Sequence, residues 1–91
     1  PIGSIVEKVM DERRTLVMNR VYDEIDRDEL SLIETEYGND VCCFCIAPII
    51  PAGDVAGSVI IFSKERGVSM GDMEQKLAET AAKFLAKQLE Q

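Results

Sequence analysis

The stretch that decides the fold is VCCFCIAPIIPAGDVAGSVIIFS, residues 41–63. Two apolar runs, residues 41–50 and 55–63, flank Pro51-Ala52-Gly53-Asp54, and such runs around a Pro/Gly/Asp turn are typical of a β-hairpin. Because successive strand residues point to opposite faces, both faces of these strands would carry apolar side chains. Both faces must therefore be covered, which predicts central strands of a sheet that lies between two other layers.

Helices are expected near both ends of the chain. Ser4 followed by Glu7 forms a capping-box pattern, and apolar residues follow at helical spacing, so a helix is predicted over Ser4–Arg14. The segment Thr15–Met18 is rich in β-forming residues and is predicted to be a strand, although its apolar residues also continue the helical spacing. Ser69 opens a second capping pattern, which predicts a helix from there to the end of the chain.

The segment between the first strand and the hairpin is polar and acidic. Residues 21–29 are predicted to form a surface loop or a short helix, and Leu30–Glu36 a short strand because its residues partly alternate. Tyr37–Asp40 has the composition of a turn, and Pro48 is expected at a bulge or strand end because it cannot donate to a ladder. Together these elements predict an α+β fold with one antiparallel β-sheet and helices on both of its faces.

The C-terminal helix has more apolar surface than one sheet can cover. At helical spacing its apolar residues form two adjoining stripes. One stripe is enough to pack on a sheet, so the second requires another partner. The methionine stripe is Met70, Met73, Leu77, Ala81 and Phe84, and the alanine stripe is Ala78, Ala82, Leu85 and Leu89.

The charge of the chain is concentrated in one segment. The net charge is −7, and the eight acids and one arginine of residues 22–40 account for all of it. A chain with this balance lacks the basic surface that binds nucleic-acid phosphates, so direct contact with nucleic acid is not expected. No apolar run approaches the ~20 residues that span a bilayer, so no membrane partner is expected.

The three cysteines, Cys42, Cys43 and Cys45, are clustered. An odd, clustered set is not a disulfide framework, which favours reduced thiols in the cytoplasm. A closed zinc site requires four well-spaced ligands and the chain has no histidine, so neither a metal nor another cofactor is predicted. The lack of histidine also removes the usual activated nucleophiles; no catalytic residue is predicted, and the chain is expected not to be an enzyme. Core packing is the favoured role of these thiols, with a redox-sensitive or ligand-lining thiol as the alternative.

The second half of the chain carries the pattern of a known family. The segments APIIPAGD, GSVIIFSK and MGDMEQKLAETAAKFLAKQLEQ, with VMDERR in the first predicted helix, resemble the C-terminal region of sporulation regulators in the AbrB-like family of transcriptional regulators. The likeness is weak between residues 15 and 40. The resemblance implies a GAF-like regulatory domain, in which an antiparallel sheet lies between helical layers. It further implies that residues 1–91 form a single GAF-like domain that lacks its first helix and strands, and that the DNA-binding domain is not present in them.

The resemblance also implies a role for the alanine stripe of the C-terminal helix. In a GAF fold the first and last helices pack together on one face of the sheet. A chain without the first helix would leave the alanine stripe uncovered. The alanine stripe is therefore predicted to form the interface of a homodimer or higher oligomer.

These observations lead to two main hypotheses on function. The first is a regulatory domain of a cytoplasmic sporulation regulator, which senses a small-molecule effector or its oligomeric state and modulates an attached DNA-binding domain. Its pocket is expected between the Ser4–Arg14 helix and the sheet face opposite the C-terminal helix, with Cys43, Cys45 and Ser58 as candidate lining residues. The second is a structural oligomerisation module that binds no ligand. A redox sensor that uses Cys43 or Cys45 is a third hypothesis.

Overall fold

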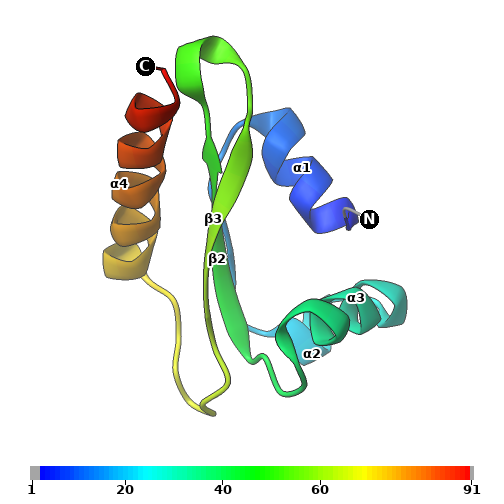
Figure 1. Ribbon diagram of the computed structural model, residues 1–91. Coiled ribbons are helices and arrows are strands. Elements are labelled where there is room, and N and C mark those ends of the chain that lie inside the picture. The colour runs from blue at the N-terminus through cyan, green and yellow to red at the C-terminus, as the bar shows by residue number, and fades with distance from the viewer. Residues whose placement is uncertain (1–2, 91) are drawn as a thin grey trace.

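A small antiparallel sheet is the centre of the fold, and helices lie on both of its faces (Figure 1). In the computed structural model, which describes residues 3–90, the elements in chain order are α1 (Ser4–Glu12), β1 (Leu16–Met18), α2 (Val21–Glu24), α3 (Arg27–Tyr37), β2 (Cys43–Ile49), η1 (Pro51–Gly53), β3 (Gly57–Ser63) and α4 (Asp72–Leu89). The described strands form one sheet in the order β1-β2-β3, with both pairs antiparallel. The predicted α+β class is confirmed.

The hairpin predicted at the centre of the sheet is confirmed as β2 and β3, which pair along their full length. The turn between them is η1, where Ala52 (φ 49°) and Gly53 (φ 92°) both take left-handed backbone, a conformation that glycine adopts without a Cβ clash. Pro48 lies inside β2 opposite Ser58, one residue before the strand ends, rather than at a bulge. β1 pairs only as far as Ile46, so β2 has one partner strand rather than two at this proline.

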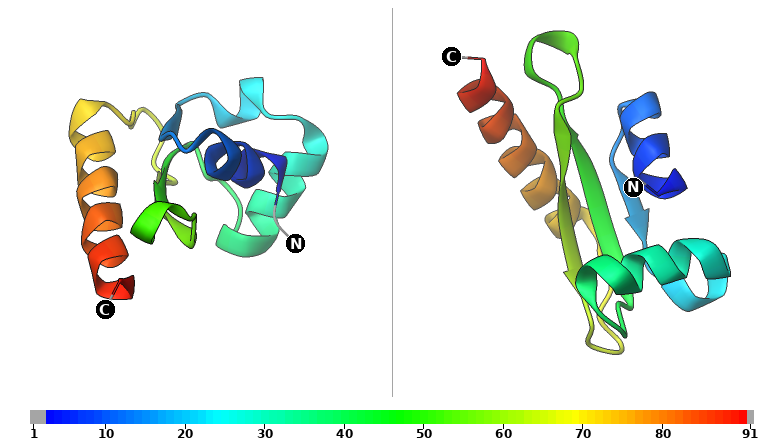
Figure 2. Two further views of the ribbon diagram at one scale, coloured as in Figure 1. Left: turned by 90° about the horizontal axis from the view of Figure 1, so that it is seen from above. Right: turned by 45° about the vertical axis from the view of Figure 1, so that its right-hand side comes forward.

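The two faces of β2 pack against different layers. Cys43, Cys45 and Ala47 lie in one core cluster with residues of α4. Phe44 and Ile46 lie in a second cluster with residues of α1, α2 and α3. The two further views show the same separation, with α4 on one face of the sheet and the other helices on the opposite face (Figure 2). The prediction that both faces of the hairpin are covered is therefore confirmed.

α4 packs on the sheet through its smallest side chains. Ala78, Ala82 and Ala86 repeat every fourth residue and are only 0%, 3% and 7% exposed. Side chains four residues apart lie on the same face of a helix, and a row of methyl groups lets the helix approach the sheet closely. The expectation that the alanine stripe has no cover within the chain is therefore wrong for Ala78 and Ala82.

The large apolar side chains of α4 face solvent instead. Met73, Leu77 and Phe84 are 77%, 60% and 63% exposed, and we call these three residues the outer face of α4. Leu85 and Leu89, the other members of the alanine stripe, are exposed as well. The helix does carry two apolar surfaces, but the smaller side chains cover the sheet and the larger ones do not.

The segment predicted as a short strand over Leu30–Glu36 is helical. The side chain of Asp26 caps α3, since it accepts a hydrogen bond from the amide of Glu29 at 2.9 Å. This cap and the helical spacing after it outweigh the partial alternation on which the strand prediction rested. The residues that follow the cap and pack toward the sheet are Leu30, Ile33 and Tyr37.

The remaining boundaries differ from the predictions by a few residues. α1 ends where Arg13 takes left-handed backbone (φ 56°), and the strand predicted after it is confirmed as β1. The short helix allowed among the acidic residues is α2. α4 begins at Asp72 rather than Ser69, because the amide of Gly71 donates to the carboxylate of Glu74 at 2.7 Å and this pair caps the helix.

Candidate ligand-binding cavity

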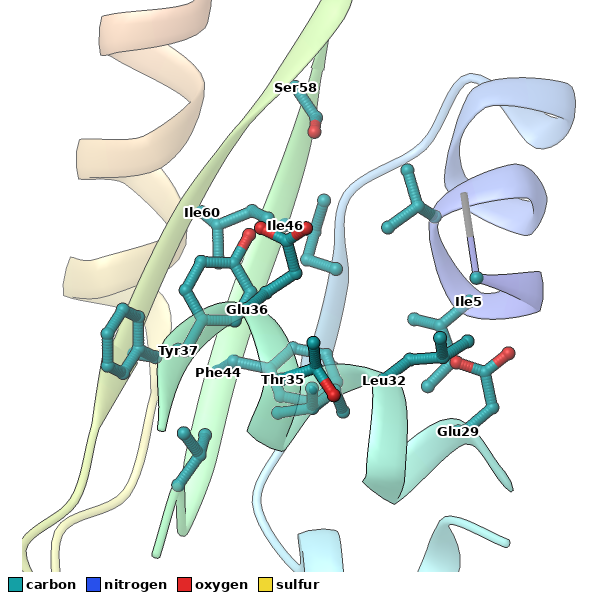
Figure 3. Close-up of a pocket in the computed structure, with 15 residues that line it drawn as sticks. Ile5, Glu29, Leu32, Thr35, Glu36, Tyr37, Phe44, Ile46, Ser58 and Ile60 are labelled. Atoms are coloured by element: carbon teal, nitrogen blue, oxygen red, sulfur yellow. The ribbon is translucent and has the colours of Figure 1, made fainter. Parts of the chain in front are cut away.

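A cavity of about 260 Å³ lies between α1, α3 and the sheet face that is turned away from α4 (Figure 3). This is the location in which a pocket was expected. The volume is just below the roughly 300–1,000 Å³ of pockets for drug-sized ligands, so an occupant must be small. The lining residues are Gly3, Ile5 and Val6 at α1, Glu29, Leu32, Ile33, Thr35, Glu36 and Tyr37 on α3, Val41, Phe44 and Ile46 at β2, and Ser58, Ile60 and Phe62 on β3.

The walls of the cavity are mostly apolar and aromatic. Phe44 and Ile46 of β2 are buried and form part of the sheet wall. The rings of Tyr37 and Phe62 lie with their centroids 5.1 Å apart and their planes inclined by 48°, an arrangement that aromatic pairs favour. Phe62 is 38% exposed, so this aromatic pair lies at the open side of the cavity.

One carboxylate joins the two helices that flank the cavity. Glu29 of α3 accepts hydrogen bonds from the amide and the hydroxyl of Ser4, the first residue of α1. A carboxylate is stabilised at this end of a helix by the unpaired amides and by the helix dipole. A Cβ on Gly3 would lie 2.7 Å from the Glu29 carboxylate, so glycine allows this close approach. The contact holds α1 against α3 at the edge of the cavity.

Polar side chains also line the cavity, among them Glu36 and Tyr37 from α3 and Ser58 from β3. Glu36 is exposed, so it marks a side at which the cavity opens to solvent. The Glu36 carboxylate lies beside the Tyr37 ring, and the Ser58 side chain reaches in from β3 (Figure 3). Burial raises the pKa of the Tyr37 phenol above its ordinary value of 10.0, and the negative charge of Glu36 raises this pKa further. Tyr37 is therefore a neutral hydroxyl at physiological pH, able to donate or accept a hydrogen bond.

Ser58 lines the cavity as the sequence predicted, but Cys43 and Cys45 do not. Both cysteines are 0% exposed and lie on the opposite face of β2, in the cluster with α4. Burial raises the pKa of both thiols, which disfavours the reactive thiolate. The expectation that these thiols line the pocket is wrong, because an alternating strand pattern does not say which set of residues faces which helix.

The contribution of α3 to the cavity was not predicted from the sequence. Six of the lining residues belong to this helix, including Glu36 and Tyr37. The predicted strand ended at Glu36 and the predicted turn began at Tyr37, so the prediction did not place these two side chains on one helix. The signal that identifies the helix is the cap, with Asp26 three residues before Glu29.

Within residues 3–90, no group of three or more histidine, cysteine, aspartate or glutamate side chains is placed to hold a metal ion. No helix in this described part of the chain combines the length and the apolar character needed to cross a bilayer.

Solved structures define the class of the fold. The chain is similar to fRMsr of Staphylococcus aureus in its reduced form, with a TM-score of 0.73 and 21% identity over 98% of this chain and 53% of that one. It is also similar to a red/green cyanobacteriochrome in its red light-absorbing state, with a TM-score of 0.74 and 13% identity over 97% of this chain and 58% of that one. At these identities the likeness concerns the fold alone. The chain has a GAF-like α+β fold, as the sequence resemblance implied.

The family is shown by the sequence comparisons. Residues 1–90 match the family described as stage V sporulation protein T C-terminal, transcription factor. The chain is 37% identical to stage V sporulation protein T of Bacillus subtilis (strain 168) over 90 residues, which is 99% of this chain and 46% of that protein. The chain therefore belongs to the stage V sporulation protein T C-terminal family of transcription factors. It spans about half the length of the relatives that it matches.

Proposed function

We propose that this chain is the regulatory domain of a cytoplasmic sporulation transcription factor, which binds a small molecule without catalysing a reaction and modulates an attached DNA-binding domain. The observation that carries the proposal is the cavity of about 260 Å³ between α1, α3 and the sheet. The cavity is partly open to solvent, so a ligand can enter it. Its walls are mostly apolar and aromatic with a few polar groups, a combination typical of ligand sites, and this lining supports a binding role.

The position of the cavity supports a regulatory role for its ligand. Its walls belong to two helices and two strands, so an occupant would contact several elements at once. α1 and α3 meet through the Glu29 carboxylate at Ser4, beside the cavity. A ligand that binds one arrangement of these helices more tightly than another shifts the population between them. This shift is the proposed signal to the rest of the transcription factor.

Self-association is the second part of the proposal, and the outer face of α4 supports it. Met73, Leu77 and Phe84 expose apolar surface along one side of a regular helix, and apolar surface in water costs about 25 cal/mol per Å². Leu85 and Leu89 are also exposed and remain proposed interface residues. The same surface favours the second candidate function, a structural oligomerisation module that binds no ligand.

A thermal-shift screen tests whether the cavity binds a ligand, with a variant whose cavity is filled by a larger side chain. Ser58→Leu adds bulk inside the cavity, whereas Ser31→Leu makes the same change at an exposed position of α3 outside the lining. A ligand at 100 times its Kd stabilises the folded state by about 2.7 kcal/mol, which raises the Tm of a domain of this size by about 10–20 °C. We expect this rise in the parent chain and in Ser31→Leu, and a much smaller one in Ser58→Leu.

The opposite result has a clear meaning. If nucleotides, amino acids and amines all leave the Tm of the parent chain unchanged, the cavity is not a binding site for these classes and the structural module is favoured. If a compound raises the Tm of all three proteins equally, it binds elsewhere and the cavity assignment is wrong.

A further inference from the structure

The acidic segment of the sequence forms one wall of the cavity. Residues 22–40 account for the whole net charge of −7, and this segment includes α3. α3 supplies six of the lining residues, among them Glu29 and Glu36. None of the fifteen lining residues is lysine or arginine, and the chain contains no histidine. Charges of one sign around a cleft with apolar walls attract ligands of the opposite sign and repel ligands of the same sign.

We propose that the cavity binds a small hydrophobic amine, with a protonated amino group on a short aromatic or aliphatic body; this inference rests on the proposed function. The ammonium lies at the open side, between the Glu36 carboxylate and the hydroxyls of Tyr37 and Ser58. The body lies inside, against the apolar residues of α1 and the sheet. Nucleotides and other anions are excluded by the same charges.

The polar groups at the open side match the needs of an ammonium. An ammonium has three donors and no acceptor, and Glu36, Tyr37 and Ser58 each offer an oxygen that accepts. The ring pair of Tyr37 and Phe62 adds faces that attract a cation. A carboxylate or phosphate in the same place would find no lysine or arginine in the lining and would lie near the Glu36 carboxylate.

Glu29 adds to the negative electrostatic field in the cavity but does not contact the proposed ammonium directly. Glu29 is only 9% exposed, and its carboxylate already accepts two hydrogen bonds from Ser4. Glu36 is exposed at the open side, and its carboxylate has no hydrogen-bond or ion-pair partner within the described residues. Glu36 is therefore the carboxylate available to pair with the ammonium. Removing its charge should weaken the binding of a charged ligand and leave the binding of a neutral ligand unchanged.

The test uses three compounds that share one body and differ in charge: phenethylamine, phenethyl alcohol and hydrocinnamate. Binding to the parent chain is measured by calorimetry and by ligand-observed NMR at one pH and ionic strength. We expect phenethylamine to bind most tightly, the alcohol about fivefold more weakly, and hydrocinnamate not at all. Tighter binding of hydrocinnamate, or equal binding of amine and alcohol, would overturn the proposed charge preference.

Two variants on α3 locate the effect. Glu36→Gln removes the charge at nearly constant shape, and Glu34→Gln makes the same change on the same helix outside the cavity lining. We expect Glu36→Gln to weaken phenethylamine about fivefold and to leave the alcohol unchanged, while Glu34→Gln changes neither. Equal weakening by both variants would mean that the amine responds to net charge alone, and the assignment to Glu36 would fail.

The same experiments separate this inference from the proposed function. If a neutral or anionic compound binds and Ser58→Leu abolishes its binding, the cavity is a ligand site and only the amine class is wrong. If no compound of any charge binds in a manner sensitive to Ser58→Leu, the proposed sensing function fails together with this inference.

Discussion

Replacing Ala78 with leucine tests which face of α4 packs on the sheet. Ala78 is 0% exposed and lies in the core cluster between α4 and the sheet, together with Cys43, Cys45 and Met70. Leucine adds three carbon atoms at a position that borders none of the described cavities. The larger side chain must displace α4 or its neighbours, and overpacking of this kind costs about 1–3 kcal/mol.

The expected effect is large enough to measure in a small domain. Near the middle of this range, a loss of about 2 kcal/mol lowers the Tm of a domain of this size by about 8–16 °C. Urea denaturation should show a lower midpoint with an unchanged slope, because the surface exposed on unfolding stays nearly the same.

Ala81→Leu is the matched control. Ala81 is three residues further along the same helix and only partly buried, so a leucine there can extend into solvent. Leucine is nearly as good a helix former as alanine, and the change in unfolding free energy should stay within about 0.5 kcal/mol. If Ala78→Leu is as stable as Ala81→Leu, or if it promotes self-association instead of unfolding, then Ala78 does not face the sheet.

Three further predictions concern other contacts of the domain. The Thr15 hydroxyl donates to Glu79 at 2.6 Å and lowers the pKa of that carboxyl below its ordinary value of 4.5, so Thr15→Val should cost about 0.5–1 kcal/mol at neutral pH. This contribution is present above the ordinary pKa and is lost as the pH falls through the folded-state value, so urea titrations should show the parent and the variant converging in acid. Phe84→Ser should weaken self-association roughly tenfold in sedimentation experiments without lowering the Tm, and an unchanged association constant would exclude the outer face of α4. Buried Cys43 and Cys45 should react with a thiol reagent only as the domain unfolds, whereas rapid native-state reaction at either of these two thiols, assigned separately from the partly exposed Cys42, would support the redox hypothesis.

The central part of the fold could be predicted because its pattern is local and strong. The hairpin has apolar side chains on both faces and a turn of proline, glycine and aspartate between the runs. These features alone require two covering layers, and the structure supplies α4 on one face and α1, α2 and α3 on the other. The position of the cavity, opposite α4, followed from the same layered arrangement together with the family resemblance.

The composition of the cavity could not be predicted, because it depends on which set of alternating residues faces which helix. Cys43 and Ser58 lie on neighbouring strands, yet one faces α4 and the other faces the cavity. Such an assignment is set by packing over the whole domain rather than by the strand sequence. The helical state of α3 was predictable in principle from the Asp26 cap, but its acidic residues obscured the apolar spacing.

The choice of alanine for the buried side of α4 has a consequence for the proposed function. Packing through methyl groups at Ala78 and Ala82 leaves the larger side chains on the outer face. One helix can then contact both the sheet and a second subunit. β2 contacts both layers as well, because Phe44 faces the cavity while its neighbour Cys45 faces α4. Under the proposed function, a ligand that displaces Phe44 would shift β2, and a shift of this one strand would change how α4 packs on the sheet. Between the cavity and the outer face of α4 lie only one layer of sheet and α4 itself, so the proposed coupling passes through two adjoining elements.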